Sequence, residues 1–206
     1  DIDTATTPED VWGGTGLIPI PAAAESLEIL SSSANDSAAG TGARTVQIRS
    51  LDGGYLEVTQ TVTLNGVTPV ALTGTHLRLN GATVLTVGSL RINEGTLTIR
   101  VAGAGADRGY VTSPEGILNQ CKFTVPNGFH LDLMSSLMTM RTLLGNESAV
   151  IAAVSTNAAG RELAAVRFGL FSAGTSIYRH EVAGGALPFN TLTARSEVTW
   201  RVSAVS

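Results

Sequence analysis

The residues of this chain that could do chemistry are three histidines, a single cysteine and many serines. A nucleophilic enzyme needs a serine or cysteine beside a base, and the candidate bases are His76, His130 and His180. The Gly-x-Ser-x-Gly sequence that places a serine on a sharp turn does not occur. A nucleophile, a base and an orienting group nowhere stand together at the spacing of a known motif. We therefore predict no catalytic residues and no enzymatic activity.

Two local arrangements offer alternatives to that prediction. His130 stands two residues before Asp132, and residues two apart on a strand share a face, so the two could form an acid-base pair. Polar strand faces are far commoner than catalytic dyads, which favours a solvated or interface face. Cys121 lies in a stretch that we expect to be a strand, where a lone cysteine is more often a small filler than an activated thiolate.

A run of small polar residues separates two apolar alternations within residues 26–48, and it contains Gly40-Thr41-Gly42. A dinucleotide-binding turn needs a third glycine at fixed spacing and a helix whose N-terminus faces the pyrophosphate. Residues 45–48 alternate as a strand instead, and no GxxxxGK[ST] sequence is present. We predict that the run only connects two strands, and we predict no cofactor.

Candidate metal ligands are sparse. The oxygen-rich clusters are Asp1 with Asp3 and Asn35 with Asp36, and neither has the spacing of a calcium-binding loop. With Cys121 as the single cysteine, an intramolecular disulfide and a zinc site built on thiolates are excluded. Neither His-x-x-x-His nor His-Glu-x-x-His occurs. We therefore predict no metal site.

The composition is typical of sheets joined by tight turns. The chain has 206 residues, of which 43% are hydrophobic, only 15% are charged and 23 are glycine, and this balance favours an all-β fold. The formal net charge is -4 and Lys122 is the only lysine, so we predict no nucleic-acid partner. No apolar segment is long enough to span a bilayer, and DIDTATTPEDVW does not resemble a signal peptide. We expect that the protein is made in the cytoplasm and does not associate with a membrane.

Apolar and polar residues alternate in short runs separated by turn residues, as in an antiparallel β-sandwich or a jelly-roll-like fold. Residues 44–64 predict a hairpin around Asp52-Gly53-Gly54, and Asn80-Gly81 predicts a kink within the apolar stretch 77–87. Residues 22–30 and 134–144 also fit short helices, and we favour strands in both. Further strands are expected around residues 97–101, 123–133, 166–170, 177–182 and 198–202.

The chain divides into three expected parts. Residues 1–24 have no sustained period and contain several glycines and prolines, which predicts an extended N-terminal arm with Trp12 as an apolar anchor. Such an arm either extends into solvent or lies along another element or another subunit. Residues 25–112 and 113–206 are expected to form two sandwich halves or domains, and residues 103–116 are the best candidate for their boundary.

The segment SLEILSSSANDSAAGTGARTVQIRSLDGGYLEVTQTVTLNGVTPVAL, residues 26–72, resembles a β-rich domain of structural proteins from tailed bacteriophage particles. DVWGGTG, LTIRVAGAG and FTVPNGFHLDL follow in the order seen in those proteins, so the likeness extends through about Met140. The closing LPFNTLTARSEVTWRVSAVS is more weakly similar to the final sandwich strands of those proteins. Residues 141–160 depart most from the pattern.

The resemblance implies a non-enzymatic virion protein that is assembled in the host cytoplasm. Its expected partners are the major capsid protein or other virion proteins, and a homo-oligomer is expected. We favour a decoration protein on the phage head; a tail component, such as a fibre, collar or adaptor, is the alternative, and a glycan-binding module is a further one. A glycan site would need clustered aromatic residues, which make up only 5% of the chain.

Two regions are candidates for contact with neighbouring molecules. The arm offers apolar side chains that can be buried in a partner, and the polar side of the 55–64 strand offers threonines without large charge repulsion. The candidate interface residues are Trp12, Ile18, Ile20, Thr59, Thr61 and Thr63.

Overall fold

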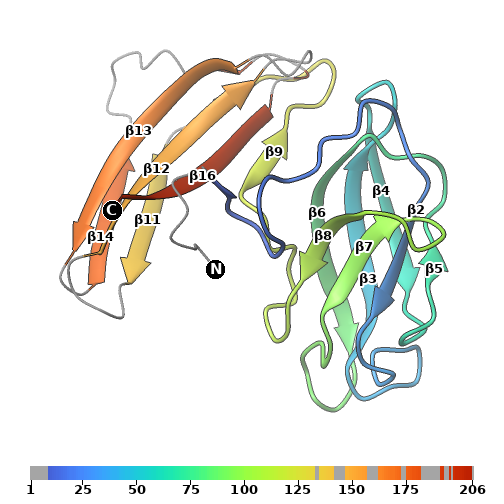
Figure 1. Cartoon of the computed structure of the whole chain (residues 1–206). Helices are drawn as coiled ribbons and strands as arrows, with labels where there is room; N and C mark the ends of the chain where they lie inside the picture. Colours follow the sequence, from blue (N-terminus) through green and yellow to red (C-terminus); the bar gives the residue numbers. More distant parts are fainter. Residues whose placement is uncertain are drawn as a thin grey trace. The chain divides into compact units, whose positions relative to one another are not determined.

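The computed structural model describes residues 9–132, 135–141, 147–156, 162–172, 175–181, 191–192, 195 and 197–205, with side chains at 10–131, 195 and 197–199. The described residues form strands, bridges and turns without a helix, which confirms the predicted all-β fold (Figure 1). The chain divides into two compact units. Unit 1 holds the described residues of 1–11, 15–17 and 121–206, and unit 2 holds residues 12–14 and 18–120.

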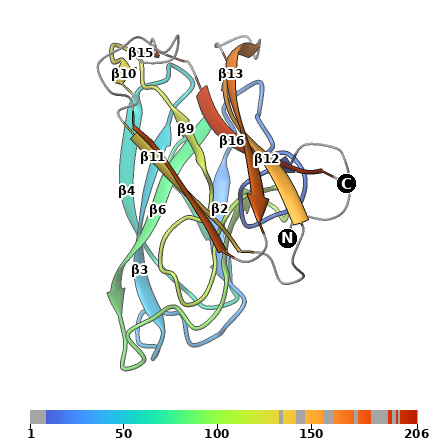
Figure 2. The same cartoon turned by 90° about the vertical axis from the view of Figure 1, so that its left-hand side faces the viewer.

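Unit 2 consists of two antiparallel sheets (Figures 1 and 2). One sheet has the strand order β5-β2-β7-β8 and the other has the order β4-β3-β6. The bounds of these strands are β2 (Leu27–Ser31), β3 (Ala43–Leu51), β4 (Glu57–Thr63), β5 (Val70–Ala71), β6 (Arg78–Val87), β7 (Leu97–Val101) and β8 (Asp107–Val111).

Both sheets of unit 2 contribute to one hydrophobic core, as expected of a sandwich. Side chains on a strand alternate between its two faces, so every second residue of β2, β3 and β7 is available to the core. Ile29, Ile48 and Ile99 are fully buried there, together with Leu97 and Val111. The core therefore lies between the sheets and leaves the outer face of β4 and β3 to carry polar residues. The jelly-roll-like alternative stays a prediction.

The hairpin and the kink that the sequence predicts are confirmed. β3 pairs with β4 from Thr45 opposite Thr63 to Leu51 opposite Glu57. Between β3 and β6 the register shifts at Arg49 and Ser50, where Asn80 is the extra residue of a β-bulge. In the turn of this hairpin Tyr55, and neither preceding glycine, takes the left-handed conformation (φ 62°).

Unit 1 contains the remaining strands, all paired antiparallel. Its largest sheet has the order β1-β16-β12-β13, with β9 also paired to β16, and the pairs β10-β15 and β11-β14 are separate. Two stretches also fit short helices in the sequence, residues 134–144 and 22–30. The first contains a strand over residues 135–141, and the second contains residues 27–30 of β2. The bounds are β1 (Glu9–Asp10), β9 (Lys122–Thr124), β10 (Leu131–Asp132), β11 (Ser135–Arg141), β12 (Glu147–Thr156), β13 (Glu162–Ser172), β14 (Thr175–Glu181), β15 (Thr191–Leu192) and β16 (Glu197–Val205).

The described part of the predicted N-terminal arm lies along other elements of its own chain. β1 pairs with β16 in unit 1, and the amide of Gly13 donates to the carbonyl of Asn119 in unit 2 (2.8 Å). Ile18 is buried at 3% exposure. The guanidinium of Arg78 donates to the carbonyl of Pro21 at 2.8 Å. Of the two alternatives for residues 1–24, the described residues 9–24 therefore follow the one in which the segment packs on neighbouring elements.

Candidate functional site

A serine and a histidine lie side by side inside unit 2. Ser50 is on the buried side of β3, and His76 lies two residues before β6. The hydroxyl of Ser50 and Nδ1 of His76 are 2.8 Å apart. Two backbone hydrogen bonds, of 2.8 and 2.9 Å, join His76 to Glu25, a residue that precedes β2. The fold thus forms a pair, a hydroxyl beside an imidazole, of a kind from which a nucleophilic site could be built.

The surroundings of this pair argue for a structural role. Ser50 and His76 are each only 2% exposed, so a substrate cannot reach the hydroxyl. In a serine-histidine-carboxylate triad an acid orients the second ring nitrogen, whereas Nε2 of His76 has the side-chain amide of Gln60 beside it, at 3.5 Å. That amide is itself held by the backbone N–H of Thr73 (2.9 Å). The pair therefore satisfies two buried polar groups within the core.

The buried histidine should make the stability of unit 2 depend on pH. Desolvation lowers the pKa of His76 below its ordinary value of 6.5, and the opposing hydrogen bond to Thr73 is the smaller effect. The folded state then binds fewer protons than the unfolded state, so the free energy of unfolding should fall as the pH drops below 6.5. Urea unfolding between about pH 5 and 7 measures this slope.

A matched pair of variants isolates the contribution of this histidine. His76→Asn should reduce the pH slope, whereas His130→Asn, at an exposed position, should retain it. Equal slopes in the wild type and His76→Asn would contradict the buried-histidine explanation.

The polar run between β2 and β3 folds around a buried carboxylate, that of Asp36, which is 0% exposed. One oxygen accepts hydrogen bonds from the amides of Ala43 (2.6 Å) and Glu94 (2.9 Å). The other accepts from the hydroxyl of Ser31 (2.6 Å) and the amide of Gly95 (2.8 Å). Asp36 therefore ties the run to both β3 and the turn before β7.

This arrangement leaves the Gly40-Thr41-Gly42 turn unsuited to a phosphate. A nucleotide-binding loop needs free backbone amides that point at the phosphate. The amides of Ala43, Glu94 and Gly95 instead donate to the carboxylate of Asp36, which carries a negative charge as a phosphate does. Gly42 is required at its position because a Cβ there would collide with Oδ1 of Asp36. The geometry thus supports the interpretation of the run as a connection between strands.

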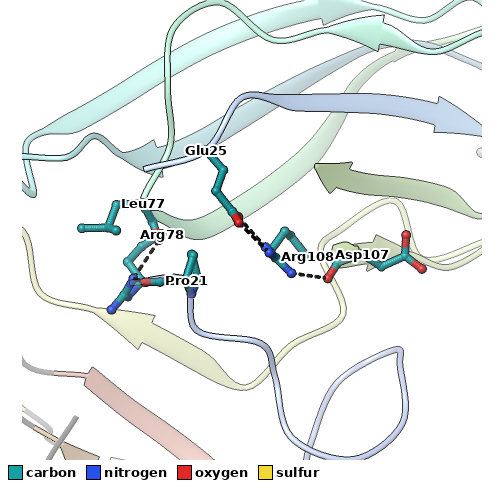
Figure 3. A network of polar contacts seen from close by, with 6 residues as sticks. All are labelled: Pro21, Glu25, Leu77, Arg78, Asp107 and Arg108. Carbon is teal, nitrogen blue, oxygen red and sulfur yellow. Dashed lines mark hydrogen bonds and ion pairs between the residues drawn. The ribbon is translucent and has the colours of Figure 1, made fainter. Parts of the chain in front are cut away.

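A second group of polar contacts fixes the segment that leads into β2 (Figure 3). The carboxylate of Glu25 forms a two-pronged contact with the guanidinium of Arg108, at 2.7 and 2.8 Å. Both side chains are partly buried. Arg78, drawn beside them, donates to the carbonyls of Pro21 (2.8 Å) and Leu77 (2.9 Å). Forked carboxylate-guanidinium pairs are strong and directional, so these charges hold the chain in place.

Structural contacts shift the pKa values of two further ionisable groups, Glu28 and Tyr110. Hydrogen bonds from the amide of Gly103 and from Arg100 are the main causes that lower the pKa of Glu28. Desolvation, followed by the hydrogen bond to Asp107 (2.6 Å), raises the pKa of Tyr110 to about 12. Both directions stabilise the protonation states that these groups have near neutral pH, and neither prepares a group for proton transfer at that pH.

The structure places the candidate interface residues differently from one another. Trp12 is half-buried, and its ring packs on Tyr110 of the same unit with 5.6 Å between ring centroids. Ile18 is buried, whereas Ile20 is 45% exposed. The threonines at 59, 61 and 63 are all exposed on one face of β4. Ile20 and these threonines are accordingly the candidate residues that remain open to a neighbour without unfolding the segment.

Among the described side chains, the other chemistry-bearing residues show no activated group. Burial raises the pKa of the Cys121 thiol although the residue retains exposed surface, so the less reactive protonated form is favoured. His130 is exposed, but the side chains of Asp132 and His180 lie outside the described residues, so the acid-base pair stays a hypothesis. Asp1 and Asp3 also lie outside them, and the amide of Asn35 donates to the carboxylate of Glu94 (2.9 Å).

The described residues contain neither a cluster of metal ligands nor a membrane-spanning helix. Within the described residues no three histidine, cysteine, aspartate or glutamate side chains gather as a metal site would require. The same part of the chain holds no helix with the length and apolar character for crossing a membrane. No family model, no curated protein and no solved structure matches the chain.

Proposed function

We propose that this chain is a non-enzymatic structural protein of a tailed phage particle, bound to the head shell as a decoration protein. One observation carries the non-enzymatic part of the proposal. In the described part of the chain the serine-histidine pair and the carboxylate of Asp36 are held inside the fold, while the surface of β4 presents exposed hydroxyls. The resemblance of residues 26–72 to phage structural proteins supplies the virion context.

The outer face of the β4-β3-β6 sheet, which we call the threonine face, is suited to contact with a protein surface. Thr63, Thr45 and Thr86 lie in one row across its three strands. The hydroxyls of Thr45 and Thr86 are 2.6 Å apart. The next row is Thr61, Gln47 and Thr83. Short β-branched side chains have little rotamer freedom to lose, and a hydroxyl costs less free energy to desolvate than a charged group does.

A decoration protein needs only modest affinity for each site on a shell. If it binds as an oligomer, the second and later contacts form at a high effective concentration, so weak faces together give tight attachment. The threonine face together with Ile20 offers contacts of this kind, and its charged residues, Arg49 opposite Thr59 and Glu57 at the end of β4, are exposed to solvent.

Immunogold electron microscopy of particles purified from the culture that produces the chain tests this proposal. Antibodies against the purified protein should label the head surface, and antibodies absorbed with the same protein should not. Labelling confined to the tail would favour the tail alternative instead. Absence of labelling on intact and on opened particles would contradict a virion role.

A further inference from the structure

The strand β4 forms an open edge of its sheet. In the order β4-β3-β6 its single neighbour is β3, and in the described part of the chain no other strand or bridge pairs with residues 57–63 (Figure 2). The opposite edge is different, because the amide of Val84 on β6 donates to the carbonyl of Gly116 (2.8 Å) and the amide of Leu118 donates to Ala82 (2.8 Å). One edge of this sheet is therefore partly covered and the other is available.

The register decides which backbone groups of β4 face outward from this edge. The amide of Leu64 donates to the carbonyl of Arg44 at 2.9 Å, in line with the pairing of Thr63 with Thr45. Residues of an antiparallel strand turn their N–H and C=O groups alternately to one side and the other. The even-numbered residues of β4 therefore bond to β3. Glu57, Thr59, Thr61 and Thr63 turn their N–H and C=O groups to the edge, where no described residue bonds to them.

Exposed edges are usually protected against pairing, and β4 lacks the common protective features. Such features are lysine, proline, a bulge or a very short strand. The sequence EVTQTVT contains neither lysine nor proline, its pairing with β3 has no register shift, and it is seven residues long. Its one charged residue is Glu57, at the end of the strand. Its composition and geometry are those of a strand that can accept another strand.

The sequence of this edge is also nearly the same when read in either direction. Residues 56–64 are LEVTQTVTL, which is symmetric about Gln60 except at Glu57 and Thr63. An antiparallel pair of identical strands related by a two-fold axis matches each residue with its mirror position. We propose that β4 pairs with β4 of a second copy of this chain, with the two-fold axis at Gln60, so that the two β4-β3-β6 sheets become one continuous sheet.

This register satisfies the outward-facing backbone groups. Thr59 lies opposite Thr61 of the second copy, and Glu57 lies opposite Thr63, so the odd-numbered residues form the hydrogen-bonded pairs and contribute about eight backbone hydrogen bonds. The two copies of Glu57 lie at opposite ends of the pair, which avoids like-charge repulsion. Leu56, which is 54% exposed, comes opposite Leu64, and the threonine face continues across the axis.

Sedimentation equilibrium of the full chain over a range of concentrations tests the pairing. The wild type should approach twice the mass of one chain. Thr61→Pro removes an N–H that points to the open edge and takes no part in the pairing with β3, so it should shift the protein toward the monomer at least tenfold in the dissociation constant. The double variant Thr59→Lys/Thr61→Lys places lysines opposite one another and should do the same.

A control separates loss of pairing from loss of fold and from added charge. Thr41→Lys/Ser89→Lys adds the same charge at exposed positions outside β4 and outside the segment that contacts Gln60, and it should dimerise as the wild type does. Circular dichroism shows whether each variant is folded. If Thr61→Pro is not folded, Thr59→Lys/Thr61→Lys provides the test of pairing. A wild type that is monomeric throughout, or a dimer that the folded β4 variants leave unchanged, overturns the proposal.

The register is tested by cysteine cross-linking in a Cys121→Ser background. On the two-fold axis a residue meets its own copy, at the close Cα spacing of a pair without mutual hydrogen bonds, which a disulfide can bridge. Gln60→Cys should therefore cross-link under mild oxidation faster than Thr61→Cys. The reverse order would place the axis at residue 61 and overturn the proposed register. None of these results depends on a virion role.

Discussion

Replacing Asp36 with alanine is expected to lower the free energy of unfolding of unit 2 by about 3–5 kcal/mol. The substitution removes the acceptor of three backbone N–H groups and one hydroxyl, and it leaves buried donors without partners. An unsatisfied buried donor is more damaging than a lost surface bond, because it forfeits its hydration as well. The loss should be seen by urea unfolding and by faster hydrogen exchange of the β3 and β7 amides.

Asp52 provides the matched control. Its carboxylate also accepts two backbone hydrogen bonds, from Gly54 (2.7 Å) and Leu56 (3.0 Å), but both are exposed to solvent. Asp52→Ala should therefore lower the free energy of unfolding by only about 1 kcal/mol, because water replaces the carboxylate. Similar losses for the two variants would show that the Asp36 carboxylate does not organise the run between β2 and β3.

The second large effect is expected from truncation of the core. Ile99→Ala should lower the free energy of unfolding by about 2–5 kcal/mol, since it opens a cavity between the two sheets of unit 2. Ile99 is fully buried, and its neighbours in the core come from both sheets, so they cannot all relax into the space. Urea unfolding with an unchanged slope measures the loss.

Ile117 is the control for this truncation because it is the same residue type at 56% exposure. Ile117→Ala should change the free energy of unfolding by less than about 1 kcal/mol. A small effect for Ile99→Ala, comparable with the control, would contradict a core shared by the two sheets.

The parts of this fold that could be predicted from sequence are those that local patterns determine. Alternation of apolar residues gives a strand its two faces, so β3, β4 and β7 could be located from the sequence. Asn80-Gly81 could be recognised as an irregularity because a glycine within a strand often marks a bulge. The exposure of Thr59, Thr61 and Thr63 follows from the same alternation.

The remaining features depend on residues that are distant in sequence. Asp36 reaches Glu94 and Gly95 across 58 and 59 positions, and Ser50 reaches His76 across 26. No local pattern indicates such pairs, and a serine-histidine pair cannot be identified from one sequence without a motif. Which of the two alternatives the 9–24 segment follows could not be predicted for the same reason, because the contact that holds Pro21 comes from Arg78.

The turn of the β3-β4 hairpin shows a different limit. Two consecutive glycines suggest that one of them takes the left-handed conformation, yet Tyr55 takes it. The guanidinium of Arg78 lies 5.8 Å from the centre of the Tyr55 ring, a distance at which a cation and an aromatic ring attract each other. A tertiary contact therefore accompanies a backbone conformation that is unfavourable for tyrosine by itself.

The most direct test of the central claim, that this chain is a structural component of a virion, is its number of copies in each particle. Purified particles can be digested with isotope-labelled standard peptides, and the chain can be counted relative to the major capsid protein by mass spectrometry. A head decoration protein should be present at a few hundred copies per particle, on the order expected for one contact per shell position. A chain absent from particles, or found only free in the lysate, would contradict the account.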